Sequence, residues 1–136
     1  MDESLARPVR ERAGHACEYC LMPQAYYPTV VFPIDHIIAR QHGGATVLSN
    51  LANSCLHCNS HKGPNIAGRD KKTKRLTPLF NPRRHKWHRH FRWDGPYLVG
   101  KTLIGRVTVY VLALNHPDLV EVREELIAEG MFPSAR

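Results

Sequence analysis

The chain has 136 residues and a formal net charge of +7, with 19 lysines and arginines against 12 acidic residues. Its hydrophobic fraction of 43% supports a core of modest size, so we expect a single domain. No apolar run reaches the ~20 residues of a membrane-spanning helix, and residues 1–12 are charged rather than apolar, which argues against a membrane protein and a secretory signal. We expect a cytoplasmic protein whose partner is a polyanion. Nucleic acid is a better candidate for this partner than a membrane surface.

The first half of the chain predicts a helix, a β-hairpin and a second helix. Residues 5–14 are expected to form a short basic helix that stops at Gly14. Residues 27–38 are rich in β-branched and aromatic side chains and precede two glycines, which predicts a strand, a loop and a returning strand. Ser49 is a candidate N-cap for a helix that opens at residues 49–53 and delivers the next pair of cysteines.

The second half predicts a mobile segment and two helices. Residues 64–84 are basic and punctuated by prolines, which is typical of a loop. Apolar residues recur at helical spacing over residues 103–114, although the β-branched run 107–111 also fits a buried strand; we expect a helix. A final helix is expected to begin with Asn115 as its cap and to end before Gly130.

Four cysteines form two pairs with the same spacing. Cys17 and Cys20 make the first Cys-x-x-Cys pair, and Cys55 and Cys58 make the second. In a reducing compartment such thiols more often bind metal than form disulfides. Four thiolates complete the tetrahedron that Zn²⁺ prefers, so we expect a structural zinc site with no open position. A thioredoxin-like redox pair and disulfides are the alternatives, but the flanking sequence lacks the βαβ pattern of the former.

A group of polar residues lies between and beside these pairs. Phosphodiester hydrolysis needs a base for water and a cation that absorbs charge on the phosphate. The side chain of His36 offers the base, and Asp35 and Asn59 offer the oxygen ligands that Mg²⁺ prefers. Neighbouring residues on a strand point to opposite faces of it. Asp35 and His36 can therefore serve one reaction only if the backbone bends between them, or if the metal ion and the water molecule lie on opposite sides of the strand.

Several short motifs occur together in this region. They are the run Phe32-Pro33-Ile34-Asp35-His36-Ile37, Gly43-Gly44, Asn50-Leu51, and Cys55-x-x-Cys58-Asn59-x-x-Lys62-Gly63. In this order and spacing, over residues 12–63, they resemble the HNH endonucleases, the zinc-stapled branch of the ββα-metal nucleases. Residues 79–106 are similar to an extension of bacterial members. The resemblance implies an α+β fold with a small ββα-metal core stapled by a four-cysteine zinc site and a C-terminal helical extension.

The resemblance also implies how the chain is organised. Residues 1–136 would be a single HNH nuclease domain, with its core at about 12–63 and a basic aromatic segment and helical extension at about 64–136. His36 would be the general base, and Asp35 and Asn59 would hold a catalytic Mg²⁺ or Mn²⁺. Asn50 would hold the base and its loop in place. Asn59 stands where many members have the last histidine, as in the HNN variants.

Basic side chains near this region are candidates for contacts with nucleic acid. They are Arg40, His61, Lys62, Arg83, Arg84, Lys86 and Arg89. His61 could instead substitute as a metal ligand. The interleaved Trp87, Phe91 and Trp93 are expected to belong to the core rather than to stack on bases. A second metal site from His85, His88 and His90 is disfavoured.

These observations lead to one functional hypothesis and two alternatives. We expect a metal-dependent HNH endonuclease that nicks or cuts DNA, with a protein partner as one means of targeting it. The first alternative is a catalytically inactive zinc-binding DNA-binding module, and the second is a relative that processes RNA. The Asp35-His36 step together with Asn59 favours the enzyme, since a module that only binds needs neither those oxygens nor that imidazole.

Overall fold

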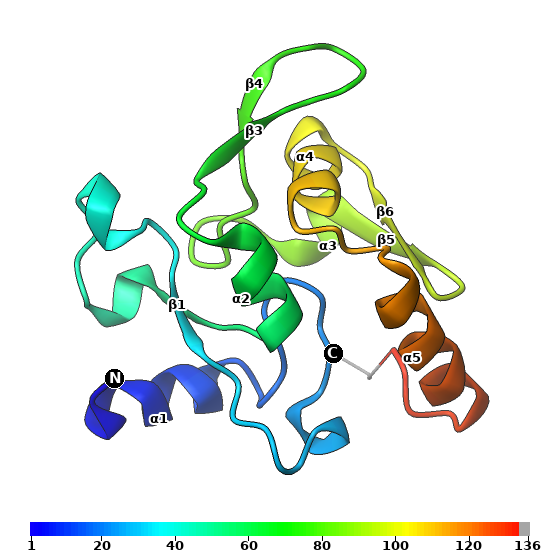
Figure 1. The fold of residues 1–136 in the computed structure, drawn as a ribbon, viewed down its shortest axis with the longest axis horizontal. Helices are drawn as coiled ribbons and strands as arrows, with labels where there is room; N and C mark the ends of the chain where they lie inside the picture. The colour runs from blue at the N-terminus through cyan, green and yellow to red at the C-terminus, as the bar shows by residue number, and fades with distance from the viewer. Residues whose placement is uncertain (134–136) are drawn as a thin grey trace. The chain divides into compact units, whose positions relative to one another are not determined.

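The computed structural model describes residues 1–133, and these form helices and short antiparallel strands (Figure 1). The α+β class expected from the sequence is confirmed. The chain divides into two compact units: residues 1–66 with 81–84, and residues 67–80 with 85 onward. Within the described residues, no helix is both long and apolar enough to cross a membrane.

The first unit begins with helix α1, Glu3–Arg12, which packs against strand β2. Asp2 caps the helix, because its side chain accepts a hydrogen bond of 2.9 Å from the backbone N–H of Ser4. The buried face includes Ala6 and Val9. Gly14 follows the helix with a φ of 63°, a conformation that favours glycine, so the predicted helix stop is confirmed.

A two-stranded sheet and a helix form the centre of the first unit. Strand β1, Ile34–His36, pairs antiparallel with β2, Leu51–Asn53, so that Asp35 lies opposite Ala52. Helix α2, Leu56–Lys62, follows at once and completes a β-β-α unit.

The hairpin expected between residues 27 and 53 is present, although each of its strands has only three residues. The helix expected to open at residues 49–53 is wrong, because residues 48–50 form a 3₁₀ turn and residues 51–53 are the returning strand. Ser49 is therefore not a cap. The N-cap of α2 is Cys55, whose sulfur accepts from the N–H of Cys58.

The second unit begins with a β-hairpin where the sequence predicted a mobile loop. Strand β3, Ala67–Arg69, pairs antiparallel with β4, Leu76–Pro78, and both strands contact helix α4, Leu103–Val111. The prediction of a loop over residues 64–84 is wrong at these strands. They are short, and basic residues dominate the turn, which hides the strand pattern.

A second hairpin, also not predicted, follows in the same unit. The short helix α3, Trp87–His90, leads into β5, Phe91–Asp94, which pairs antiparallel with β6, Tyr97–Gly100. Its core-facing side chains include Phe91 and Leu98, each 1% exposed. Phe91 joins the core as expected, and Trp87 and Trp93 are half-buried.

Two helices complete the second unit. Helix α4 confirms the helical alternative for residues 103–114 and begins at Thr102, whose hydroxyl accepts from the N–H of Gly105. Helix α5, Pro117–Ala128, is followed by Gly130 in a positive-φ conformation, as expected. Its cap is His116 and not Asn115. The side chain of Asn115 instead makes two hydrogen bonds with the backbone of Leu98.

Candidate metal centre and active site

The four cysteines meet in one buried cluster in the first unit. Cys17 and Cys20 lie in a turn between α1 and β1, whereas Cys55 and Cys58 lie at the start of α2. All four sulfurs are within 4.8 Å of one another, and those of Cys20 and Cys55 are 3.7 Å apart. A tetrahedral zinc site with Zn–S bonds of about 2.3 Å places its sulfurs about 3.8 Å apart. The cluster therefore has the dimensions of a metal site with four cysteine ligands.

Burial raises the pKa of the Cys58 thiol well above its ordinary value. At Cys17 burial also opposes ionisation, but hydrogen bonds from the other three cysteines lower the pKa well below its ordinary value. A metal displaces the proton of each thiol that it binds, because the ligand is the thiolate. Within the part of the chain that the structure describes, this is the one group of three or more histidine, cysteine or acidic side chains placed to hold an ion. His85, His88 and His90 do not form a second such group.

Asp35 lies beside this cluster and is 5% exposed. The hydroxyl of Tyr19, a residue of the first cysteine pair's turn, donates a 2.7 Å hydrogen bond to Asp35 Oδ2. The ammonium of Lys62 on α2 lies 3.1 Å from the same carboxylate oxygen. Burial raises the pKa of Asp35, and Lys62 and Tyr19 oppose that shift. Burial of a carboxylate is tolerated here because a cation and a hydroxyl contact it.

His36, the next residue of β1, is more exposed than Asp35. It is half-exposed, and its Nε2 is 2.9 Å from the hydroxyl Oγ1 of Thr46. The alternation of a strand explains this arrangement, because Asp35 faces the core and the next side chain faces solution. Lys62 connects the two faces, since its ammonium also donates to the backbone carbonyl of His36 at 3.1 Å.

Asn50 closes the loop that carries Thr46. Its side-chain oxygen accepts from the N–H of Ile38, and its amide nitrogen donates to the carbonyls of Ile38 and Ala45, at 2.9 to 3.0 Å. Gly44 lies in the same loop, where an added Cβ would come within 1.7 Å of the Ile38 carbonyl oxygen. Only glycine fits this close approach, which accounts for the second residue of the Gly43-Gly44 pair.

Asn59 and His61 are both carried by α2. Asn59 is half-buried and precedes Lys62 by three residues, which places the two side chains on the same face of the helix. His61 is exposed, its Nδ1 is 2.9 Å from the backbone carbonyl oxygen of His57, and its ring stacks on the His57 ring at 4.0 Å. The contact that joins α2 to Asp35 is thus made by Lys62, one turn from Asn59.

The segment that carries these residues matches a known family. Residues 17–65 match the family model described as HNH endonuclease. Over this segment the chain is similar to the HNH endonucleases. Its match includes both cysteine pairs, β1, β2 and α2, so the resemblance stated from the sequence is confirmed there. Neither the curated proteins nor the solved structures contain a match.

Most of the side chains predicted to contact nucleic acid are accessible to solution. Arg40, Arg84, Lys86 and Arg89 are exposed, as such contacts require. For Lys62 the prediction is contradicted, because its side chain is 1% exposed and paired with Asp35. Arg83 is only 17% exposed; it forms an ion pair with Glu18 and donates to the carbonyl of Leu51.

Two residues that contact the predicted site residues were not found from the sequence. Tyr19 contacts Asp35 and Thr46 contacts His36, each through a hydroxyl group. A tyrosine inside a Cys-x-x-Cys turn is a weak signal, because a buried aromatic residue near a metal usually has a packing role. Thr46 carries no signal, since its position depends on how Asn50 folds the loop.

Proposed function

We propose that this chain is a metal-dependent endonuclease that hydrolyses the phosphodiester bonds of DNA. The observation that carries the proposal is the placement of His36 within the HNH segment: its imidazole is accessible to solution on the strand whose preceding residue, Asp35, is buried against α2. An accessible imidazole can reach a water molecule and a phosphate, whereas a buried one cannot.

His36 would act as the general base. Its neutral imidazole would take a proton from water, and the resulting hydroxide would attack the phosphorus in line with the 3′ oxygen. The bond from phosphorus to the 3′ oxygen then breaks, and the departing 3′ oxygen takes a proton from solvent water, which leaves a 5′-phosphate and a 3′-hydroxyl. Thr46 would orient the ring through its contact with Nε2. A positioned general base commonly contributes about 10²–10⁴ in rate.

The proposal includes two metal ions in different roles. The cysteine cluster has the sulfur ligands and the dimensions of a structural Zn²⁺ site. Asp35 and Asn59 offer hard oxygen ligands for Mg²⁺ or Mn²⁺, and each oxygen of a carboxylate has two lone pairs, so the contacts from Tyr19 and Lys62 leave acceptor capacity on Asp35. A divalent cation bound there would absorb negative charge on the phosphate oxygens.

A second candidate is a DNA-binding module without catalysis. The observation that favours it is the ion pair of Asp35 with Lys62, because this pair already neutralises the carboxylate proposed to hold the catalytic cation. Asn59 also offers an amide oxygen where many members of the family offer an imidazole nitrogen. In this alternative the zinc site and the basic surface remain, and only hydrolysis is lost.

Incubation of the whole protein with supercoiled plasmid tests the proposal. We expect conversion to nicked or linear DNA with Mg²⁺ or Mn²⁺, none with EDTA, and a rate lowered by about 10²–10⁴ in His36→Ala. A Thr46→Val variant keeps the imidazole of His36, so its cleavage rate should fall much less than that of His36→Ala. Cleavage by His36→Ala at the parent's rate would refute the assignment of the base. Binding of DNA with no cleavage under any divalent cation would favour the second candidate, and cleavage of RNA alone would indicate the RNA-processing alternative.

A further inference from the structure

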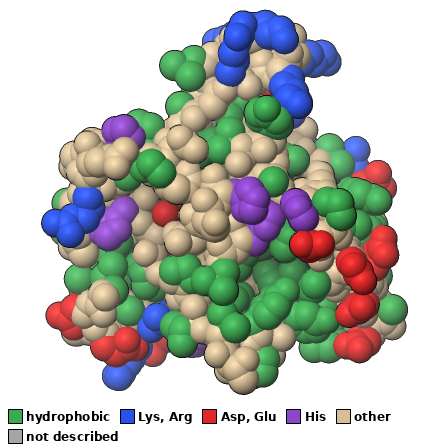
Figure 2. Space-filling view, in the orientation of Figure 1, with side chains coloured by type: hydrophobic (Ala, Val, Ile, Leu, Met, Phe, Trp, Pro, Cys, Tyr) green, Lys and Arg blue, Asp and Glu red, His purple; other side chains and the backbone are tan. Residues whose placement is uncertain are grey.

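The β3–β4 hairpin carries a concentration of positive charge that the proposed catalytic site does not use. Residues 69–75 hold five cations and one carboxylate, a net of +4 against +7 for the whole chain. The cations are Arg69, Lys71, Lys72, Lys74 and Arg75, and all five are exposed. Figure 2 shows lysine and arginine side chains gathered over this hairpin.

Asp70 gives the turn of this hairpin a defined shape. It is 3% exposed, and its Oδ2 accepts hydrogen bonds of 2.8 Å from both the N–H and the hydroxyl of Thr73. The backbone of Asp70 also pairs across the turn with Lys74 and Arg75. The cations of the turn are therefore displayed on a folded scaffold instead of a disordered loop.

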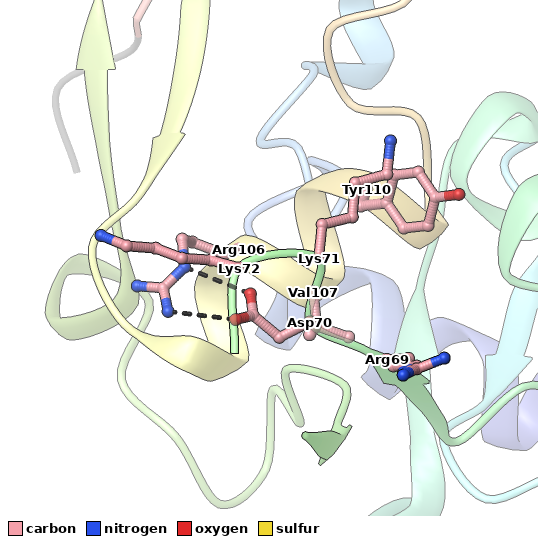
Figure 3. Close-up of a pocket in the computed structure, with 7 residues that line it drawn as sticks. All are labelled: Arg69, Asp70, Lys71, Lys72, Arg106, Val107 and Tyr110. Atoms are coloured by element: carbon pink, nitrogen blue, oxygen red, sulfur yellow. Dashed lines mark hydrogen bonds and ion pairs between the residues drawn. The ribbon is translucent and has the colours of Figure 1, made fainter. Parts of the chain in front are cut away.

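Helix α4 anchors the hairpin. The guanidinium of Arg106 donates to both carboxylate oxygens of Asp70, at 3.2 and 3.4 Å (Figure 3). Gly68 of β3 packs so closely on the helix that an added Cβ would lie 2.6 Å from a methyl group of Val111. These contacts hold the hairpin at one position on α4 within the second unit.

The anchoring pair leaves the other cations without acidic partners. The charge of Asp70 is matched by Arg106, and among the described residues none of the hairpin's five exposed cations forms an ion pair with a carboxylate. Like charges that are held close together repel one another. Neutralisation by a polyanion would remove this repulsion and release the polyanion's counterions.

The surroundings of the turn offer room and apolar contact. An open hollow of about 220 Å³ is lined by Arg69, Asp70, Lys71, Lys72, Arg106, Val107 and Tyr110 (Figure 3). The Lys71 ammonium lies 4.1 Å from the centre of the Tyr110 ring, which directs it along one wall. Leu76, opposite Arg69 in the hairpin, is 81% exposed. In such a surface the cations can contact the phosphates of a nucleic acid, and the ring and the aliphatic side chain can contact its sugars.

Building on the proposed function, we propose that the β3–β4 hairpin is a docking element for duplex DNA. Its cations contact phosphates, and the two-stranded ribbon lies along the major groove. That groove is about 12 Å wide in B-DNA and admits a β-ribbon, whereas the deep, narrow major groove of duplex RNA does not. The hairpin thereby adds affinity for the duplex.

A charge-matched pair of variants tests this docking element. Lys72→Gln/Lys74→Gln removes two positive charges from the turn, and no hydrogen bond or ion pair of either ammonium group occurs in the described structure. Arg7→Gln/Lys101→Gln removes the same charge from exposed positions on α1 and after β6, and it also removes one hydrogen bond from the Lys101 ammonium to the backbone carbonyl of His88. Both variants and the parent should be compared by fluorescence anisotropy on one duplex DNA and on a duplex RNA of the same sequence across a series of salt concentrations, with melting curves to show that each is folded.

We expect the hairpin variant to bind about tenfold or more weakly and to show a slope of log K against log salt that is shallower by about 1.8, which is 0.9 for each phosphate that is no longer neutralised. The control should keep the parent's slope to within about half a unit. Equal affinity and slope in the hairpin variant and the control would overturn the inference, as would a loss confined to duplex RNA. A parent that binds DNA with the expected hairpin dependence yet never cleaves it would overturn the proposed function alone.

Discussion

The ammonium of Lys62 lies 3.1 Å from the carboxylate of Asp35, and their side chains are 1% and 5% exposed. Removing one member of such a pair leaves the other charge buried without a partner, which commonly costs about 3–5 kcal/mol. We predict a loss of this size for Asp35→Asn in urea unfolding. Glu3→Gln, which breaks the exposed pair with Arg10, should cost less than about 1 kcal/mol.

A double variant separates the pair from its two members. Asp35→Asn/Lys62→Met should be more stable than the sum of the single losses predicts, because neither charge is then left alone. Strict additivity would contradict a coupling between the two residues. These stability measurements are also needed to interpret activity. A loss of cleavage in Asp35→Asn reports on the site only at temperatures where that variant remains folded.

Asn50 should control both the stability and the activity of the HNH segment. Asn50→Asp keeps the acceptor for the N–H of Ile38 but loses the two hydrogen bonds donated to the carbonyls of Ile38 and Ala45. At about 0.5–1.5 kcal/mol for each hydrogen bond, we predict a loss of about 1–3 kcal/mol. Amide exchange at Ile38 should accelerate, and plasmid cleavage should fall because Thr46 no longer holds His36. Unchanged exchange together with unchanged cleavage would contradict this role.

Metal removal should unfold the first unit. Zinc binding supplies about 10–16 kcal/mol of apparent free energy in small zinc domains, which matches or exceeds the ~5–15 kcal/mol of net stability that a domain possesses. We predict about one equivalent of zinc per chain by elemental analysis and loss of the folded circular dichroism signal in Cys17→Ser. Ser60→Ala, at an exposed position of α2, should keep both. A Cys17→Ser protein that melts like the parent would show that the cluster is not a metal site.

The contribution of Asp70, in the β3–β4 hairpin, to the free energy of unfolding should decrease at acid pH. Hydrogen bonds from Arg106 and then Thr73 lower the pKa of Asp70 to about 2, below the value of about 3.9 for an unfolded chain. A carboxyl group whose pKa is lower in the folded state stabilises that state above the unfolded pKa, and this contribution is lost as the pH falls toward the folded pKa. The difference in unfolding free energy between the parent and Asp70→Asn should therefore be constant above about pH 5 and shrink between about pH 4 and 2. A difference that stays constant down to pH 2 would contradict the ionised contact.

The sequence predicted the metal cluster and the HNH segment well because their signals are sets of spaced residues. The spacing of Cys17, Cys20, Cys55 and Cys58 specifies four ligands whatever structure lies between them. The order of Asp35-His36, the two glycines and Asn50 adds a second, independent pattern. Such patterns depend on which residue types a site needs, and they remain readable when the connecting elements are too short to recognise.

The elements themselves were harder to predict, for local reasons. Strands of three residues, such as Ile34–His36 and Leu51–Asn53, are too short to show alternation. Ser49 is a residue type that commonly caps helices. The cap of α2 is instead the sulfur of Cys55, and cysteine is not among the residues preferred at this position. Buried pairing cannot be seen in one sequence either. The sequence therefore predicted an exposed Lys62, whereas in the structure its ammonium is buried against Asp35.

Tyr19 links the cysteine cluster to the buried carboxylate of Asp35. It sits between Cys17 and Cys20, and its hydroxyl holds Asp35. A newly made chain that has not yet acquired its thiolate-bound ion would lack the turn that brings this hydroxyl to the carboxylate. In the proposed enzyme, binding of the structural ion would therefore precede assembly of the site around Asp35.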